Sequence, residues 1–250
     1  MFKLLWAERQ KMRRSKIVWI AVFATVMAAV IVFAAGQEVY YGSETVYYGS
    51  RYVDHAGWFM NVGQSLSTYF VLPAVIALVG SYMICREEQE DTLKQLRLIP
   101  VNETKLTAAK MIIAFFFSIL LYLLLFAVTF LTEAVLHFSD LPKGMVWGFL
   151  KEYLLDGAGI FFAVSPLVAL VSRWKKGYWL VLVFTEIYSV GGLLAGMSKI
   201  SAAIYPVMAV FNFSGHTAAA GKLWSLAILL LCGCISVFIL KGLNRSESNS

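Results

Sequence analysis

The sequence has little charge. Of its 250 residues only 14% are Asp, Glu, Lys or Arg, whereas 60% are hydrophobic, and the mean hydropathy is +0.72. A soluble domain of this size carries about a quarter charged residues. The composition therefore excludes an ordinary soluble domain and predicts a polytopic membrane protein.

Cysteine and histidine are also scarce, with three of each. Cys85 ends one apolar run, and Cys232 and Cys234 lie within another, where thiols behave as small apolar side chains. The histidines stand apart from one another, near predicted loops: His55, His137 and His216. Without a C-x-x-C pair or a Cys/His cluster, we expect no metal and no cofactor bound directly to this chain.

Catalytic and nucleotide-binding motifs are missing as well. The sequence contains neither a GxSxG elbow nor an H-E-x-x-H zinc pair. The Gly221-Lys222-Leu223 step lacks the Ser or Thr and the upstream glycine of a P-loop. We therefore expect that the chain is not an enzyme by itself.

Apolar segments of about 20 residues, the length that spans a bilayer as a helix, recur along the chain. We predict an all-α fold in a single domain of residues 1–250 with six transmembrane helices. The first of these segments could instead be a signal peptide cut after Phe33-Ala34-Ala35, but its apolar run is longer than the apolar core of a typical signal peptide. Pro73 predicts a kink in the second. The spans are residues 17–35, 66–85, 111–131, 154–171, 177–196 and 223–240.

The longest charged segment, residues 86–110, carries five acids and five bases between two predicted spans. It must face water. Within it, Leu93 and Leu96 lie one turn apart on one face of a short amphipathic helix that Pro100 ends. From composition alone, docking to another protein and a solvated hairpin without a partner are equally open.

The two ends of the chain are polar. Residues 1–16 hold six Lys and Arg and predict an interfacial helix on an anionic leaflet, or only a positive flank that sets topology. Residues 199–222, split by Pro206, predict two short re-entrant helices, and residues 241–250 predict a disordered tail. The expected contacts with membrane lipids come from Lys11, Arg13, Arg14 and Lys16.

The distribution of basic residues predicts the orientation. With the N-terminus inside, the inner segments hold sixteen Lys and Arg and the outer loops hold five. Both termini and residues 86–110 are therefore expected to be cytoplasmic. Because the basic residues cluster at span ends rather than along a stripe, nucleic acid is not an expected partner.

Glu186 lies ten residues into the fifth predicted span, and it is the one acid that the predicted spans place deep in the bilayer. A carboxylate there is costly unless it faces the bundle or water. Glu186, with Tyr188 nearby, is therefore a candidate contact in a translocation path, and the alternative is a structural hydrogen bond between helices. Without further deep polar residues, an integral-membrane enzyme is the least favoured function.

Several motifs resemble the ABC transporter permeases of the type-2 exporter class. The segment Glu88-Gln89-Glu90-Asp91-Thr92-Leu93, with Leu96, Pro100 and Lys110, is similar to the family's coupling helix between spans two and three, although Asp91 stands where glycine is usual. The opening, residues 7–20 (AERQKMRRSKIVWI), is similar to the lantibiotic-immunity and bacitracin-resistance branch.

The resemblance implies the membrane subunit of an ATP-driven exporter that removes an amphipathic peptide antibiotic or a lipid-like substrate. A separate nucleotide-binding ATPase, carrying ATP and Mg, would dock on the coupling segment, and a second permease copy or a related permease would complete the pathway. Glu186 leaves one alternative, a proton- or ion-coupled secondary transporter. The residues implied in ATPase coupling are Glu88, Glu90, Asp91, Thr92, Leu93, Leu96 and Pro100.

Overall fold

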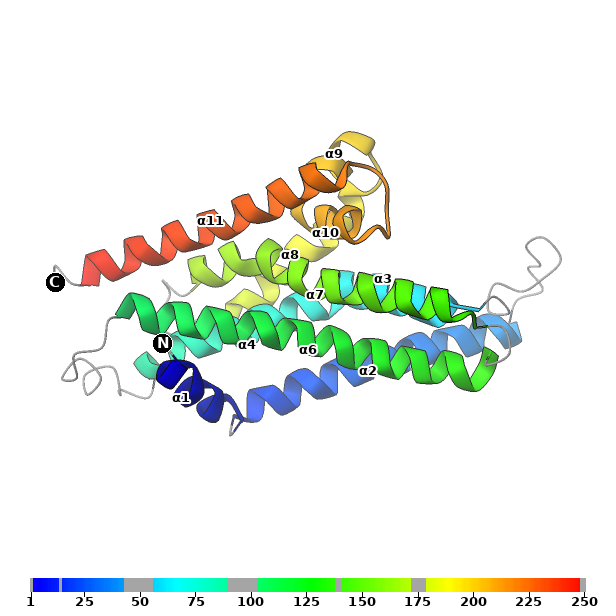
Figure 1. The fold of residues 1–250 in the computed structure, drawn as a ribbon, viewed down its shortest axis with the longest axis horizontal. Helices are drawn as coiled ribbons and strands as arrows, with labels where there is room; N and C mark the ends of the chain where they lie inside the picture. The colour runs from blue at the N-terminus through cyan, green and yellow to red at the C-terminus, as the bar shows by residue number, and fades with distance from the viewer. Residues whose placement is uncertain are drawn as a thin grey trace.

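The computed structural model describes residues 2–13, 15–42, 56–89, 103–137, 141–171 and 179–247. Every regular element in these ranges is an α-helix, so the predicted all-α fold is confirmed there (Figure 1). The helices are α1 (Phe2–Arg13), α2 (Lys16–Gly42), α3 (Trp58–Phe70), α4 (Leu72–Gln89), α6 (Glu103–His137), α7 (Lys143–Val171), α8 (Leu180–Ala195), α9 (Lys199–Ile204), α10 (Pro206–Ser214) and α11 (Lys222–Glu247).

Four of these helices, α2, α6, α7 and α11, are long and apolar enough to cross a membrane. Helices α3 and α4 together form a fifth candidate, bent by 48° at the break between them. Helix α8 is apolar but has only 16 residues. A typical transmembrane helix needs about 20. A multi-pass helical membrane protein is thus confirmed, and a count of six spans stays a prediction.

The second predicted span, residues 66–85, is wrong as a single helix. Helix α3 begins earlier, at Trp58, and ends at Phe70, where Val71 leaves helical geometry with φ −131° and ψ −58°. Pro73 then occupies the first turn of α4, where its missing N–H costs no helical hydrogen bond. The proline therefore marks a break two residues before it rather than a kink within one helix.

Other boundaries also differ from the prediction, since α2 continues to Gly42 and α6 extends beyond its predicted span at both ends. Helix α7 begins at Lys143, whereas the span was predicted to begin at residue 154. Lys151, Glu152 and Asp156 lower the hydropathy of this stretch, but they do not interrupt the helix. Helix α11 runs through Lys241 to Glu247, so most of the tail predicted to be disordered is helical.

Helix α7 lies at the centre of the bundle and packs against α4, α6, α10 and α11 (Figure 1). Its contact with α6 is close at Gly157, where a Cβ atom would lie 3.0 Å from the Cα of Ile119. Ser118 Oγ donates a hydrogen bond of 2.6 Å to the carbonyl of Gly157 at this crossing. A small residue at a crossing lets two membrane helices approach closely.

Residues 199–222 contain two short helices, α9 and α10, separated as predicted at Pro206, which begins α10. Asn212 holds the pair together, because its Nδ2 donates to the Ala202 carbonyl at 3.0 Å. Gly215, with φ 103°, then turns the chain toward α11. The position of the pair relative to the membrane surface stays a prediction.

Candidate functional site

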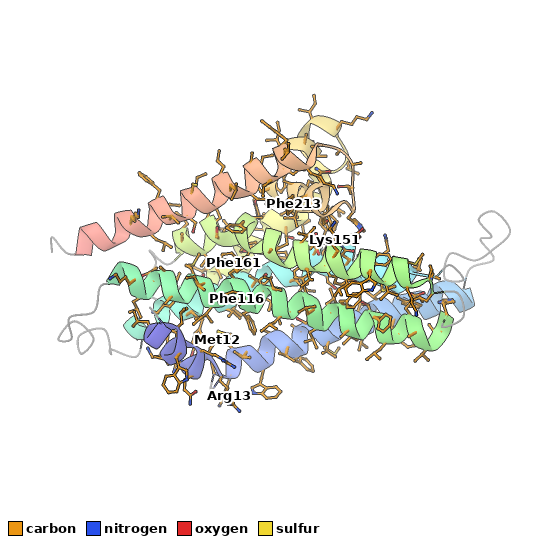
Figure 2. The ribbon with its side chains drawn as sticks, in the orientation of Figure 1. Met12, Arg13, Phe116, Lys151, Phe161 and Phe213 are labelled. Carbon is orange, nitrogen blue, oxygen red and sulfur yellow. The ribbon has the colours of Figure 1, made fainter. Side chains whose placement is uncertain are left out.

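One end of the molecule gathers both termini, α1, the end of α4 and the beginning of α6 (Figure 1). Helix α1 packs against α6, and Arg86 Nη1 on α4 donates to the Lys11 carbonyl at 3.3 Å. Met12 packs against the hydrophobic core, whereas Arg13 is exposed and points away from the helices (Figure 2). Helix α1 is therefore fastened at its carboxyl end to the helices that flank the charged segment.

The residues predicted to contact lipid at this end differ in their surroundings. Lys11 is partly buried, and its Nζ lies 2.8 Å from Glu8 Oε1. Lys16 is exposed at the first position of α2. Arg14 lies outside the described residues.

The predicted coupling residues fall largely outside the described part of the chain. Glu88 belongs to the last turn of α4. Coupling through this segment stays a prediction, and the residues outside the described ranges are Glu90, Asp91, Thr92, Leu93, Leu96 and Pro100.

Glu186 and Tyr188 do not form one site. Two residues apart on α8, they are rotated by about 200° around the helix axis. Glu186 is partly exposed, and its carboxylate has no hydrogen-bond or ion-pair partner among the described residues. Tyr188 instead faces inward, where its Oη donates to the Ala163 carbonyl at 3.3 Å and its own carbonyl accepts from Tyr205 Oη at 2.6 Å.

A second acid lies deep in the bundle, so the expectation that Glu186 is the only one is wrong. Asp156 on α7 is fully buried, about 20 Å along the helix from Lys143. Its Oδ2 accepts a hydrogen bond of 2.6 Å from Gln64 Nε2 on α3, which is also fully buried. Asp156 Oδ1 and Gln64 Oε1 have no hydrogen-bond partner within the described structure.

Further polar contacts extend from this pair along the inner face of α3. Thr68 Oγ1 lies 2.9 Å from Tyr122 Oη on α6, and Ser189 Oγ on α8 donates to the Thr68 carbonyl at 3.1 Å. Tyr153 Oη on α7 donates to the Met60 carbonyl at 2.6 Å. We call Gln64, Thr68, Tyr122, Tyr153 and Asp156 the buried polar core; it joins α3 to α6, α7 and α8.

Glu152, one turn before Asp156 on α7, takes part in a contact among three segments that is centred on a histidine. His216, in the turn after α10, has its Nε2 2.9 Å from Ser65 Oγ on α3 and its Nδ1 3.9 Å from Glu152 Oε2 on α7. The order Ser, His, Glu is that of a hydrolase triad, but 3.9 Å is too long for a hydrogen bond. The geometry instead tethers the turn before α11 to the neighbouring helices.

Glu133 lies between the predicted spans 111–131 and 154–171, but it belongs to α6 and is fully buried. Its Oε1 accepts from the Gly57 N–H at 2.7 Å and its Oε2 from the Phe59 N–H at 3.0 Å, while His137 Nδ1 lies 2.9 Å from Oε1. The first N–H groups of a helix lack partners within it and attract negative charge. Glu133 therefore caps α3 and has a structural role.

These observations define a multi-pass helical membrane protein with an acid inside its helix bundle, and such acids are found along substrate and ion pathways. The sequence of residues 4–192 matches the family model described as ABC-2 family transporter protein. Because the match covers well over half of the chain, the chain belongs to the ABC-2 family. It is a multi-pass plasma-membrane protein and an ABC transporter membrane subunit.

A curated relative agrees with this family and refines the branch. The chain is 29% identical over 170 residues to the bacitracin transport permease protein BCRB of Bacillus licheniformis. The aligned residues make up 67% of this chain and 81% of that protein. The resemblance to type-2 exporter permeases of the bacitracin-resistance-like branch is thus confirmed. Permeases of this family work with a separate nucleotide-binding ATPase subunit.

Proposed function

We propose that this permease expels an amphipathic peptide antibiotic, or a lipid-like molecule, from the membrane and so confers resistance or immunity. The observation that carries the proposal is the family match over residues 4–192, together with the likeness to a permease whose name assigns it to bacitracin transport. The energy comes from ATP and Mg on the partner ATPase. A membrane-dissolved cargo can enter laterally between helices, so a large aqueous cavity is not required.

Coupling to the ATPase is proposed at the end that holds α1, α4 and α6. Residues 90–102 connect α4 to α6, and the ATPase would dock on Leu93 and Leu96 there. The Arg86–Lys11 hydrogen bond supports this arrangement, because a displacement of α4 would also move α1. The excess of Lys and Arg in the segments at this end supports placing it in the cytoplasm.

Glu186 supports a second permease copy. Its face of α8 also carries Val183 and Ile187, which are 46% and 67% exposed. A carboxylate directed at lipid is costly, and a second permease packed on this face would remove Glu186 from lipid. We therefore place Glu186 between two subunits, where it would contact the cargo path. No contact among the described residues favours the ion-coupled carrier. Permeases of this family use ATP, through their ATPase subunit, as the energy source.

The buried polar core supplies the inner surface of such a path. If α3 and α7 separate during transport, Gln64 and Asp156 are the polar groups that become accessible, and the cost of breaking their hydrogen bond limits opening without ATP.

The test is a resistance assay. A bacitracin-sensitive host expressing the permease with its partner ATPase should tolerate more bacitracin, while its tolerance of a ribosome-directed antibiotic stays unchanged. The same strain with an ATPase that cannot hydrolyse ATP is the control. Equal bacitracin sensitivity in the two strains would exclude this cargo.

A further inference from the structure

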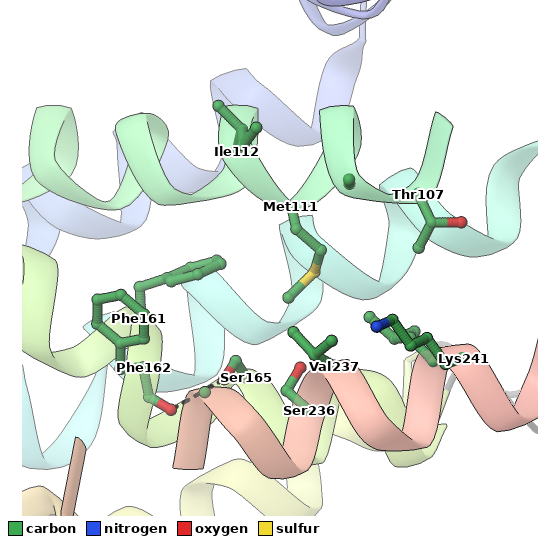
Figure 3. A pocket seen from close by; sticks show the side chains of 12 residues that line it. Thr107, Met111, Ile112, Phe161, Phe162, Ser165, Ser236, Val237 and Lys241 are labelled. Carbon is green, nitrogen blue, oxygen red and sulfur yellow. Dashed lines mark hydrogen bonds between the residues drawn. The ribbon is translucent and has the colours of Figure 1, made fainter. Parts of the chain in front are cut away.

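The space between α6 and α11 is an apolar groove. Both helices pack along α7 and make few contacts with each other. The groove encloses about 260 Å³, which is below the usual range for sites of drug-sized ligands. Met111 of α6 and Phe161 and Phe162 of α7 are among the apolar residues that line it (Figure 3). It fits a narrow flexible chain better than a compact ligand.

A buried hydroxyl group interrupts this apolar surface. Ser236 of α11 lines the groove and is only 2% exposed, yet its Oγ has no hydrogen-bond partner among the described residues. Figure 3 shows this hydroxyl directed into the groove. A buried hydroxyl is ordinarily paired, because leaving it unpaired costs free energy. An occupant that offers a hydrogen-bond acceptor at this depth would satisfy it.

A positive charge stands at one end of the groove. Lys241 follows Ser236 by five residues, about 7.5 Å along α11. Its side chain lies between α11 and α6 near Met111 (Figure 3). Its ammonium group has no ion-pair partner among the described residues. This end of α11 lies toward the end of the molecule that holds both termini (Figure 1).

We propose that this groove binds one anionic glycerophospholipid of the cytoplasmic leaflet. The phosphate pairs with Lys241, an ester carbonyl accepts the hydrogen bond of Ser236, and an acyl chain fills the space beside Met111 and Phe161. The order of charge, hydroxyl and apolar surface along the groove is the order of phosphate, ester and acyl chain in such a lipid. Placement in the cytoplasmic leaflet rests on the orientation proposed above.

The test is native mass spectrometry of the purified permease, without ATPase or ATP. Phosphatidylglycerol and phosphatidylcholine with identical acyl chains are added in equal amounts. The unchanged protein should retain phosphatidylglycerol over phosphatidylcholine by about fivefold, the effect of one basic side chain near an anionic surface. Lys241→Gln should abolish this preference, whereas Lys222→Gln, at the opposite end of α11, should preserve it.

A second variant tests the apolar part of the groove. Val237→Trp fills the space beside Met111 and should reduce retention of both lipids. The proposal is overturned if the unchanged protein shows no headgroup preference, if Lys241→Gln and Lys222→Gln behave alike, or if Val237→Trp retains lipid fully. If the permease forms a dimer that Val237→Trp abolishes, and no headgroup preference is found, the groove is the contact with a second permease copy and the lipid proposal is again overturned. Because no transport is measured, failure here leaves the proposed export function untouched.

Discussion

Asp156 and Gln64 place one short hydrogen bond inside a membrane helix bundle, together with two oxygen atoms that have no hydrogen-bond partner in the part of the chain that the structure describes. Such groups are maintained only where the surrounding helices hold them in place. Their contact joins α3 to α7, so the pair contributes to stability as well as to any path between these helices.

Replacing Asp156 tests the contribution of this contact to stability. Asp156→Asn keeps an acceptor for Gln64 Nε2, so we expect near-normal thermal stability in detergent. Asp156→Leu leaves the Gln64 amide buried without a partner, which costs about 1–3 kcal/mol and should lower the melting temperature measured by intrinsic fluorescence. Equal melting temperatures for both variants would show that the Asp156–Gln64 contact does not hold the helices together.

Glu186→Gln should impair export more than assembly, because the substitution removes the charge but keeps the shape of the side chain. The measurement compares bacitracin tolerance with the amounts of permease and ATPase recovered together. Thr185→Val, at the neighbouring buried position, is the matched control for changes in packing. Normal tolerance in Glu186→Gln would return this residue to a structural role.

A lone charge in an apolar run is conspicuous in a sequence, and Glu186 was singled out in this way, although its role stays a prediction. Asp156 was missed because Lys151 and Glu152 precede it, so the hydropathy of the segment is low and the span was predicted to begin only at residue 154. One signal was present: Tyr153, Asp156, Gly157 and Ile160 recur at the spacing of one helix face.

At the scale of elements, hydropathy located the apolar helices but not their ends. Glu133 shows why, since its carboxylate caps α3, which is distant in sequence, and α6 can therefore continue through it. In the sequence, the break at Val71 was likewise indicated only by the nearby Pro73. Tertiary contacts of this kind leave no local pattern in the sequence.

The charged segment between α4 and α6 carries a prediction of its own. Replacing Leu93 and Leu96 together by Asp should release the ATPase, because the leucines form the apolar face of the proposed coupling helix. Co-purification from membranes and ATPase activity measure this. Lys143→Asp, at the first position of α7, is the control, and membrane insertion should be normal in both. Unchanged co-purification of the leucine variant would contradict the coupling assignment.

For the whole molecule, the exposed face of α8 predicts how two copies meet. Ile187→Cys, in a background with the native cysteines replaced by serine, should form a disulfide-linked dimer in membranes under mild oxidation. Val135→Cys on α6, a position that is 83% exposed, is the control and should stay monomeric on a non-reducing gel. The opposite pattern would place the subunit contact on α6.

The central claim is that this chain is the membrane subunit of an ATP-driven exporter. It is tested most directly by purifying the tagged permease in mild detergent, expressed from its native gene cluster, and identifying the bound proteins by mass spectrometry. We predict a stoichiometric ATPase with a Walker motif, together with a second permease, identical or related. A permease recovered alone across several detergents would contradict the account and favour a carrier in which Glu186 titrates.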